Sequence, residues 1–216
     1  VYSGPTTVNA GTLAVSAIGG LDNSRSITVA AGATLDVTGL GGTLTLGSTT
    51  NAQSLGGSGT VTGNVLASGT GPATIAPGAS AGELTISGSL ILAGNSTVAM
   101  ELDTSAVPTS DRITATAMTG GAATLTVTNI GPLLSVGQSF TLFSPAIAGL
   151  SWAGTVSDVY ADYTFTDNIA VDGTIVVATV TSIFPLVPTN MTWSVSGGNL
   201  NLGWPASYTG WVLQTQ

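Results

Sequence analysis

The chain has 216 residues, enough to bury a substantial core, and 43% of them are hydrophobic. Charged residues make up only 6%, about a quarter of the share in an average soluble domain. Ten acidic residues, two arginines and no lysine give a net charge of −8, which excludes a basic groove for nucleic acid. The absence of cysteine and histidine excludes disulfides, thiolate chemistry, a Ser-His-Asp triad and imidazole metal sites.

No apolar run approaches the roughly 20 residues of a membrane helix, so we expect no insertion into a membrane. The sequence has no signal peptide and enters its repeating pattern already at Val1. We therefore expect a mature or trimmed product. Helix signals are almost absent because glycine and β-branched residues are too dense, so the sequence predicts an all-β protein.

Residues 1–73 alternate aliphatic and small polar residues between glycine turns, which is typical of short strands. The segments TTVNAGTLAV and ITVAAGATLDV share one pattern, in which Val8 corresponds to Val29 and Leu13 to Leu35. A recurring unit of this size predicts a β-solenoid, in which each coil buries its apolar face only against its neighbours. The side chains expected inside are Val8, Leu13, Val15, Ile27, Val29, Leu35, Val37, Leu44 and Leu46.

The stretch 74–102 contains the clearest strand signals. Alternating runs at 83–87 and 89–93 meet at Gly88, and a third run, 96–102, follows the Gly94-Asn95 turn. We assign residues 1–102 to the solenoid.

The composition changes after residue 102. A polar segment, 104–110, contains Pro108, and longer, more aromatic strands follow it. We assign 103–182 to a β-sandwich-like cap over one end of the solenoid, closed by the aromatic residues Phe140, Phe143, Trp152, Tyr160, Tyr163 and Phe165.

Residues 183–216 form the third predicted unit, a C-terminal strand segment. Pro185 and Pro188 predict a stiff, extended hinge. Beyond it, runs at 191–195, 199–204 and 210–214 have the pattern of the opening strands of a small sandwich. Three such strands expose unpaired edges and are marginal alone, so we predict that this segment is a donor between subunits.

Two phrases resemble a known family. The segment 2–13, YSGPTTVNAGTL, is similar to the autotransporter-associated β-strand repeat of large bacterial surface proteins, and 75–86, IAPGASAGELTI, resembles the motif that closes such passenger solenoids. The start at Asp111-Arg112-Ile113 followed by 137–143 extends the likeness over roughly residues 1–180. The tail 191–214 is similar to fibronectin-type segments of bacterial surface proteins. The resemblance implies a secreted or surface-displayed β-solenoid.

Two groups of carboxylates are candidates for chemistry. Glu101, Asp103 and Asp111 would need facing carboxylates about 5 to 9 Å apart to act as an acid/base pair, and we interpret them instead as solvated loop-edge acids with Arg112 as counter-charge. The weak calcium candidates lack the spacing of a calcium-binding loop; they are Asp158, Asp162, Asp167 and Asp172. We expect no cofactor and no resident metal.

The sequence also offers contacts for sugars. The sequons at Asn95 and Asn190 match glycan acceptor sites, although such matches in bacteria are usually chance. Trp193, Trp204 and Trp211 could stack on glycans or complete a core.

These observations favour a structural function over catalysis. The hypothesis is a subunit of a bacterial extracellular filament or surface layer, which forms a homopolymer by end-to-end stacking, strand donation or both. The residues expected at the contacts are Val1, Tyr2, Ile183, Phe184, Leu186, Val187, Trp193, Trp204 and Trp211. The alternative is an adhesin-type binding module with glycans as possible ligands. A polysaccharide-cleaving enzyme ranks third, because Arg25 and Arg112 are far apart in the sequence.

Overall fold

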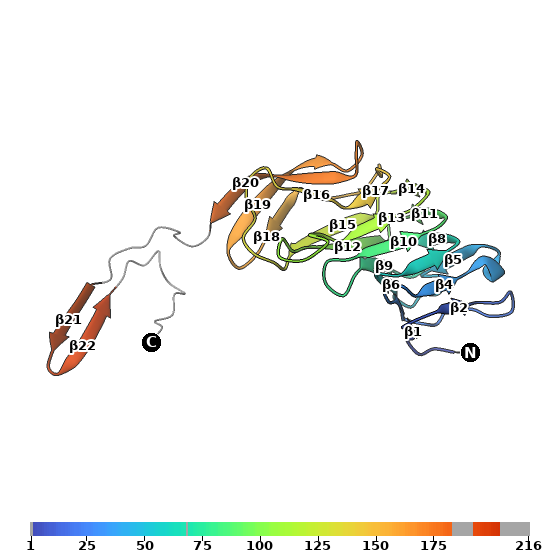
Figure 1. The fold of residues 1–216 in the computed structure, drawn as a ribbon, viewed down its shortest axis with the longest axis horizontal. Coiled ribbons are helices and arrows are strands. Elements are labelled where there is room, and N and C mark those ends of the chain that lie inside the picture. Colours follow the sequence, from blue (N-terminus) through green and yellow to red (C-terminus); the bar gives the residue numbers. More distant parts are fainter. Residues whose placement is uncertain (1, 68, 183–191, 204–216) are drawn as a thin grey trace.

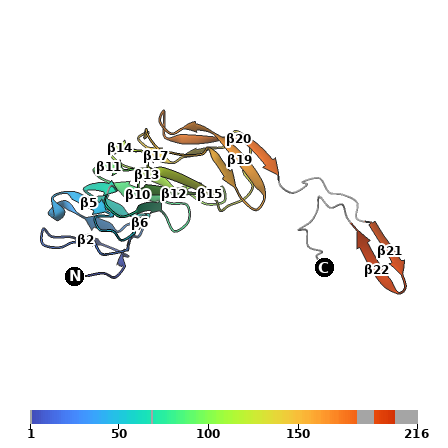
Figure 2. The same cartoon turned by 180° about the vertical axis from the view of Figure 1, so that it is seen from behind.

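The computed structural model describes residues 2–67, 69–182 and 192–203, which form an all-β protein (Figures 1 and 2). As the sequence predicts, successive coils stack three parallel sheets into a β-solenoid, and this solenoid has about 5 turns. An antiparallel sheet follows the stack. Among the described residues, no helix has the length and apolar character needed to cross a membrane.

Each coil adds one strand to each of two or three sheets. Sheet A contains β1 (Thr6–Val8), β3 (Ser26–Val29), β6 (Gln53–Gly57), β9 (Ala73–Pro77), β12 (Ser96–Leu102) and β15 (Thr124–Asn129). Sheet B contains β2 (Thr12–Ala14), β4 (Thr34–Asp36), β7 (Thr60–Thr62), β10 (Glu83–Ile86), β13 (Arg112–Thr114) and β17 (Phe143–Ser144). Sheet C contains β5 (Thr43–Leu46), β8 (Asn64–Ala67), β11 (Ser89–Leu92) and β14 (Ala117–Thr119), and a 3₁₀ turn, η1 (Thr38–Leu40), precedes β5.

The register of the strands confirms the repeat read from the sequence. Val8 lies opposite Val29 in sheet A, and Leu13 lies opposite Leu35 in sheet B. Equivalent residues therefore stack directly, because parallel strands place matching positions one above another about 4.8 Å apart.

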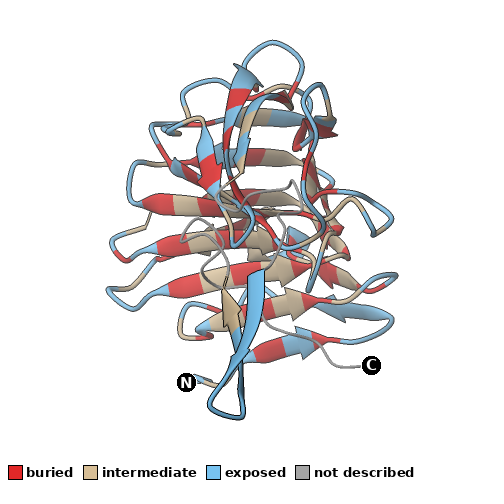
Figure 3. Ribbon diagram, turned by 90° about the vertical axis from the view of Figure 1, so that its left-hand side faces the viewer, coloured by how far each residue is buried: buried red, intermediate tan, exposed pale blue. Residues whose placement is uncertain are grey.

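Inward-facing aliphatic residues form continuous ladders through the stack, visible as the repeated buried positions of Figure 3. One ladder in sheet A joins Ile27, Leu55, Ile75, Val98 and Leu125, all at most 2% exposed. Because successive side chains of a strand point to opposite faces, the same strands present threonine and serine outward.

Leu13 departs from the expected core. It is 39% exposed, and Val15 is only half-buried, whereas the other seven predicted inward residues are buried. Strand β2 is the outermost strand of sheet B, and the first coil adds no strand to sheet C. Leu13 therefore has a neighbouring coil on one side only.

The parallel stacking continues past the boundary expected after residue 102. Strands β13, β14 and β15, all beyond that position, pair in parallel with β10, β11 and β12. The polar segment after β12 is a short excursion, closed where Leu102 bridges Ser110 and the Asp103 amide donates to the Thr109 carbonyl at 2.8 Å. The proline and the polar residues of this segment are typical of a linker between domains, but the chain continues from it into the next coil of the solenoid.

The cap is a four-stranded antiparallel sheet, D, in the order β16 (Ser139–Thr141), β20 (Thr174–Ser182), β19 (Ala161–Asn168) and β18 (Thr155–Ser157). Phe140, Phe143, Tyr163 and Phe165 are buried and belong to the same continuous core as the solenoid residues. Trp152 packs partly buried against this core, with its ring centroid 5.7 Å from that of Phe165. Tyr160 is 52% exposed and does not help to close the end.

The last described residues form a hairpin, β21 (Thr192–Ser196) and β22 (Asn199–Gly203). These strands match two of the three runs expected in the C-terminal segment. The third run, 210–214, and the proline hinge lie outside the described residues.

Candidate functional site

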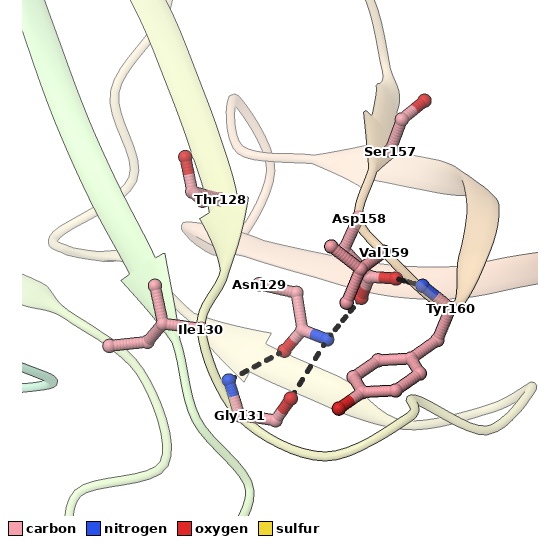
Figure 4. A pocket seen from close by; sticks show the side chains of 8 residues that line it. All are labelled: Thr128, Asn129, Ile130, Gly131, Ser157, Asp158, Val159 and Tyr160. Atoms are coloured by element: carbon pink, nitrogen blue, oxygen red, sulfur yellow. Dashed lines mark hydrogen bonds between the residues drawn. The ribbon is translucent and has the colours of Figure 1, made fainter. Parts of the chain in front are cut away.

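A cavity of about 390 Å³ lies where the last long strand of the solenoid, β15, ends beside the turn between β18 and β19 (Figure 4). It is lined by Thr128, Asn129, Ile130, Gly131, Ser157, Asp158, Val159 and Tyr160. Side chains from the solenoid and from the cap meet here, which makes the cavity a candidate site for a ligand.

The Asp158 carboxylate is fully engaged within the protein. Its Oδ1 accepts hydrogen bonds from the backbone amides of Tyr160, at 2.6 Å, and Ala161, at 2.9 Å. Its Oδ2 accepts from the Asn129 side-chain amide at 2.6 Å and from the Tyr163 hydroxyl at 2.9 Å. Partial burial alone would raise the pKa of Asp158, but these four donors lower it. All four acceptor positions of the carboxylate are used, so it is not a free base.

Asn129 completes this polar cluster. Its side-chain nitrogen also donates to the carbonyls of Gly131 and Pro132, and its oxygen accepts from the Gly131 amide. Burial, and then the hydrogen bond to Asp158, raise the pKa of the Tyr163 hydroxyl. We therefore interpret the cluster as a clamp between solenoid and cap.

The rim of the cavity is apolar. Ile130, Val159 and Tyr160 are 46%, 68% and 52% exposed. The exposed ring of Tyr160 can stack on a sugar or pack against another chain. The apolar rim supplies no acid, base or nucleophile.

Of the three acids that the sequence singled out, Glu101 and Asp111 line one cavity, whereas Asp103 does not line it. Asp103 accepts hydrogen bonds from the amide and hydroxyl of Ser105 within the excursion after β12. Asp111 is fully buried, so the interpretation as a solvated loop-edge acid is wrong for this residue. Arg112 is the counter-charge of Glu83, the residue directly opposite it on β10, and not of this group.

The four calcium candidates are also separate. Asp158 belongs to the clamp, the Asp167 carboxylate accepts from the Ile169 amide, and Asp172 accepts from the amide and hydroxyl of Thr174. Asp162 lies exposed on β19 opposite Ser157. Within the described part of the chain, no three acidic side chains come together in an arrangement that could hold a metal ion.

The first sequon is built into the solenoid. The Asn95 side-chain nitrogen donates to the carbonyls of Gly69, at 2.6 Å, and Gly71, at 3.2 Å, on the preceding coil. The following Ser96 is 1% exposed. The nitrogen that would carry a glycan therefore holds two turns together, and Asn190 of the second sequon lies outside the described residues.

Two of the predicted assembly residues can be placed. Tyr2 is 56% exposed, and its hydroxyl donates to the Pro5 carbonyl; Trp193 is 71% exposed on β21. The others lie outside the described residues, namely Val1, Ile183, Phe184, Leu186, Val187, Trp204 and Trp211.

The β21–β22 hairpin has one apolar and one polar face. Trp193 lies opposite Leu202, and Val195 lies opposite Leu200, so these four side chains share a face. Trp193, Val195 and Leu200 are all more than 60% exposed. The alternation in the sequence NLNLG at 199–203 indicates this face, but the sequence interpretation had named only its tryptophan.

The two ends of the solenoid differ. No described strand pairs with the outer edges of β1, β2 and β5. At the other end, the chain between residues 147 and 173 covers the final coil: Ser151 bridges Thr124, and the Gly120 amide donates to the Ala148 carbonyl. Open strand edges therefore gather at one end, opposite the cap.

Comparison with protein-family models finds no match to this chain, and comparison with curated proteins finds none either.

Proposed function

We propose that this chain is a structural subunit of a bacterial extracellular filament or surface layer, without enzymatic activity, that assembles with copies of itself by strand donation. The observation that carries the proposal is the β21–β22 hairpin, whose apolar face is exposed in the described residues. A two-stranded hairpin is marginal in water, and added strands would stabilise it.

The rest of the molecule supports the same proposal. Edge strands normally carry charges, especially lysine, that oppose edge-to-edge pairing, and this chain has no lysine. The outer edges of β1, β2 and β5 offer backbone groups to an added strand. The covered final coil disfavours simple end-to-end stacking, so donation of a strand is the preferred mode. The resemblance to passenger solenoids supports the extracellular location.

Electron microscopy of the full chain tests the hairpin. We expect filaments from the wild type and soluble monomers when Trp193→Ser and Val195→Ser remove the β21 half of the apolar face. Ser194→Ala changes the polar face of the same strand and is the matched control, which should assemble normally. Deletion of residues 183–216 should also give monomers, and filaments of unchanged order after this deletion would contradict strand donation.

A second pair of variants tests the open edges. Leu13→Lys places a charge on the outermost strand β2, whereas Ile91→Lys places one at a similarly exposed position on β11, which is paired on both sides. We expect only Leu13→Lys to impair assembly. A wild-type protein that stays monomeric at high concentration would overturn the filament proposal.

The exposed Tyr160 beside its cavity favours one alternative, a surface-binding module for glycans. Saturable binding of monomeric protein on a glycan array, abolished by Tyr160→Ala, would support this function. A subunit with a purely structural function should show no saturable ligand.

A further inference from the structure

Asp111 is the one charged side chain that is buried in the part of the chain that the structure describes, with 0% of its surface exposed. Its Oδ1 accepts a hydrogen bond from the Gly82 amide and its Oδ2 accepts one from the Glu101 amide, both at 2.8 Å. The backbone amide of Asp111 donates in turn to the Glu101 carbonyl at 2.8 Å. Asp111 thus links the turn before β10, in the fourth coil, to the end of β12, in the fifth.

A cavity adjoins Asp111, although none of the residue's surface is exposed. This cavity of about 200 Å³ is lined by Asp111 together with Pro77, Gly78, Met100 and Glu101.

Among the described residues, no positively charged side chain is paired with Asp111. The neighbouring Arg112 guanidinium donates to the Glu83 carboxylate, which also accepts from Thr114. Glu101, on β12, adds a second negative charge, and the Asp103 carboxylate is bonded to Ser105.

The balance of these effects favours the neutral acid. Burial raises the pKa of Asp111, the amides of Glu101 and Gly82 oppose this, and the charge of Glu101 raises the pKa further, to about 7. Removing an uncompensated charge from water costs more than two amide hydrogen bonds return.

We propose that Asp111 is a pH-sensitive staple, which holds the fourth and fifth coils together in acidic solution and loosens their junction as the pH rises toward neutrality. Protonated Asp111 is accommodated without a counter-charge. Ionised Asp111 gains solvation when the turn before β10 opens, so ionisation and opening promote each other. This inference does not rest on the assembly proposed above.

The direction of the effect follows from proton linkage. Between the ordinary pKa of 3.8 and about 7, the folded state holds a proton that the unfolded state has released. Stability contributed by this group is complete below pH 3.8, falls as the pH rises through the window, and is level above about 7. The equilibrium constant for unfolding should increase by up to about tenfold per pH unit within the window.

The composition of the chain allows the titration of Asp111 to be observed with little overlap from other side chains. The chain has no histidine and no cysteine, the side chains that ordinarily titrate closest to neutrality. A carbon-13 NMR titration of the side-chain carboxyl groups in the full wild-type chain should find one aspartate that titrates near pH 7. Exchange of the Gly82 and Glu101 amides, corrected for the intrinsic effect of pH, should accelerate over the same range.

Two variants assign the effect. Asp111→Asn should remove the pH dependence of urea unfolding between pH 5 and 7, whereas Asp36→Asn, which changes an aspartate bonded to Thr38, should retain it. The wild-type titration decides the matter if Asp111→Asn fails to fold. Titration of Asp111 with the ordinary carboxyl groups near pH 4, or an unchanged pH dependence in Asp111→Asn, would overturn the proposal.

Discussion

Asn129 donates a 2.6 Å hydrogen bond to Asp158, a residue 29 positions later, and thereby joins the last strand of sheet A to the antiparallel cap. We predict that Asn129→Ala destabilises the protein by about 1–3 kcal/mol, because it removes several buried hydrogen bonds at once. Urea unfolding followed by circular dichroism measures the change. Asn51→Ala is the control, since the Asn51 side chain is exposed and bonds to no described residue; an equal loss in both variants would contradict the clamp.

Much of the solenoid could be predicted because local pattern determines it. The strand Ser96–Leu102 matches the expected run residue for residue, and the strands Ser26–Val29, Thr43–Leu46 and Asn64–Ala67 fall within the region 1–73 that was expected to form short strands. In each, period-two alternation and bounding glycines act together, and the repeat identifies equivalent positions on successive coils. Residues that touch on adjacent coils are separated by only one repeat in the sequence, so the nearby sequence largely determines these contacts.

The polar contacts could not be predicted in this way. The Asn129 to Asp158 bond and the enclosure of Asp111 depend on loops that leave the repeat and return. Alternation assigns a residue to a face of a strand but says nothing about a side chain in a turn. For the same reason, Asp111 next to Arg112 resembles a surface pair, whereas Arg112 bonds across the sheet to Glu83.

Leu13 and Leu35 are direct neighbours in sheet B, but Leu13 is 39% exposed and Leu35 is 0% exposed. Leu35→Ala should cost about 2–5 kcal/mol, because it leaves a cavity in the core. In the monomer Leu13→Ala should cost about 1 kcal/mol or less, because little buried area is lost. Unfolding at low protein concentration measures both.

Assembly should change this difference. If another copy covers the first coil, Leu13→Ala will weaken filaments more than it weakens monomers. Dissociation of filaments on dilution, followed by light scattering, tests this. A Leu13→Ala variant that dissociates at the wild-type concentration would place the contact elsewhere.

The ion pair between Arg112 and Glu83 should contribute little. Their side chains are 42% and 33% exposed, so we expect Arg112→Gln to cost about 0–1 kcal/mol and the cost to shrink in high salt. The hydrogen bond from Arg112 lowers the pKa of Glu83 below its ordinary 4.5, and the stability from this pair is therefore lost as the pH falls through the lowered value. Wild type and variant should unfold alike well below pH 4, and a gap that persists there would contradict an electrostatic origin.

Glycine is needed at the corners of the coils for two different reasons, positive φ and close packing between coils, and Gly32 and Gly57 allow the two to be compared. Both have positive φ, of 97° and 75°, but an added Cβ at Gly57 would lie 2.1 Å from the Val29 carbonyl oxygen, whereas one at Gly32 meets nothing within 4 Å. Gly32→Ala should therefore cost only the backbone strain of about 1–2 kcal/mol. Gly57→Ala must also push two coils apart, so its cost should exceed that of Gly32→Ala by about 1–3 kcal/mol. Thermal unfolding of the two variants side by side gives the difference, and equal melting temperatures would show that the coils at Val29 and Gly57 yield without cost.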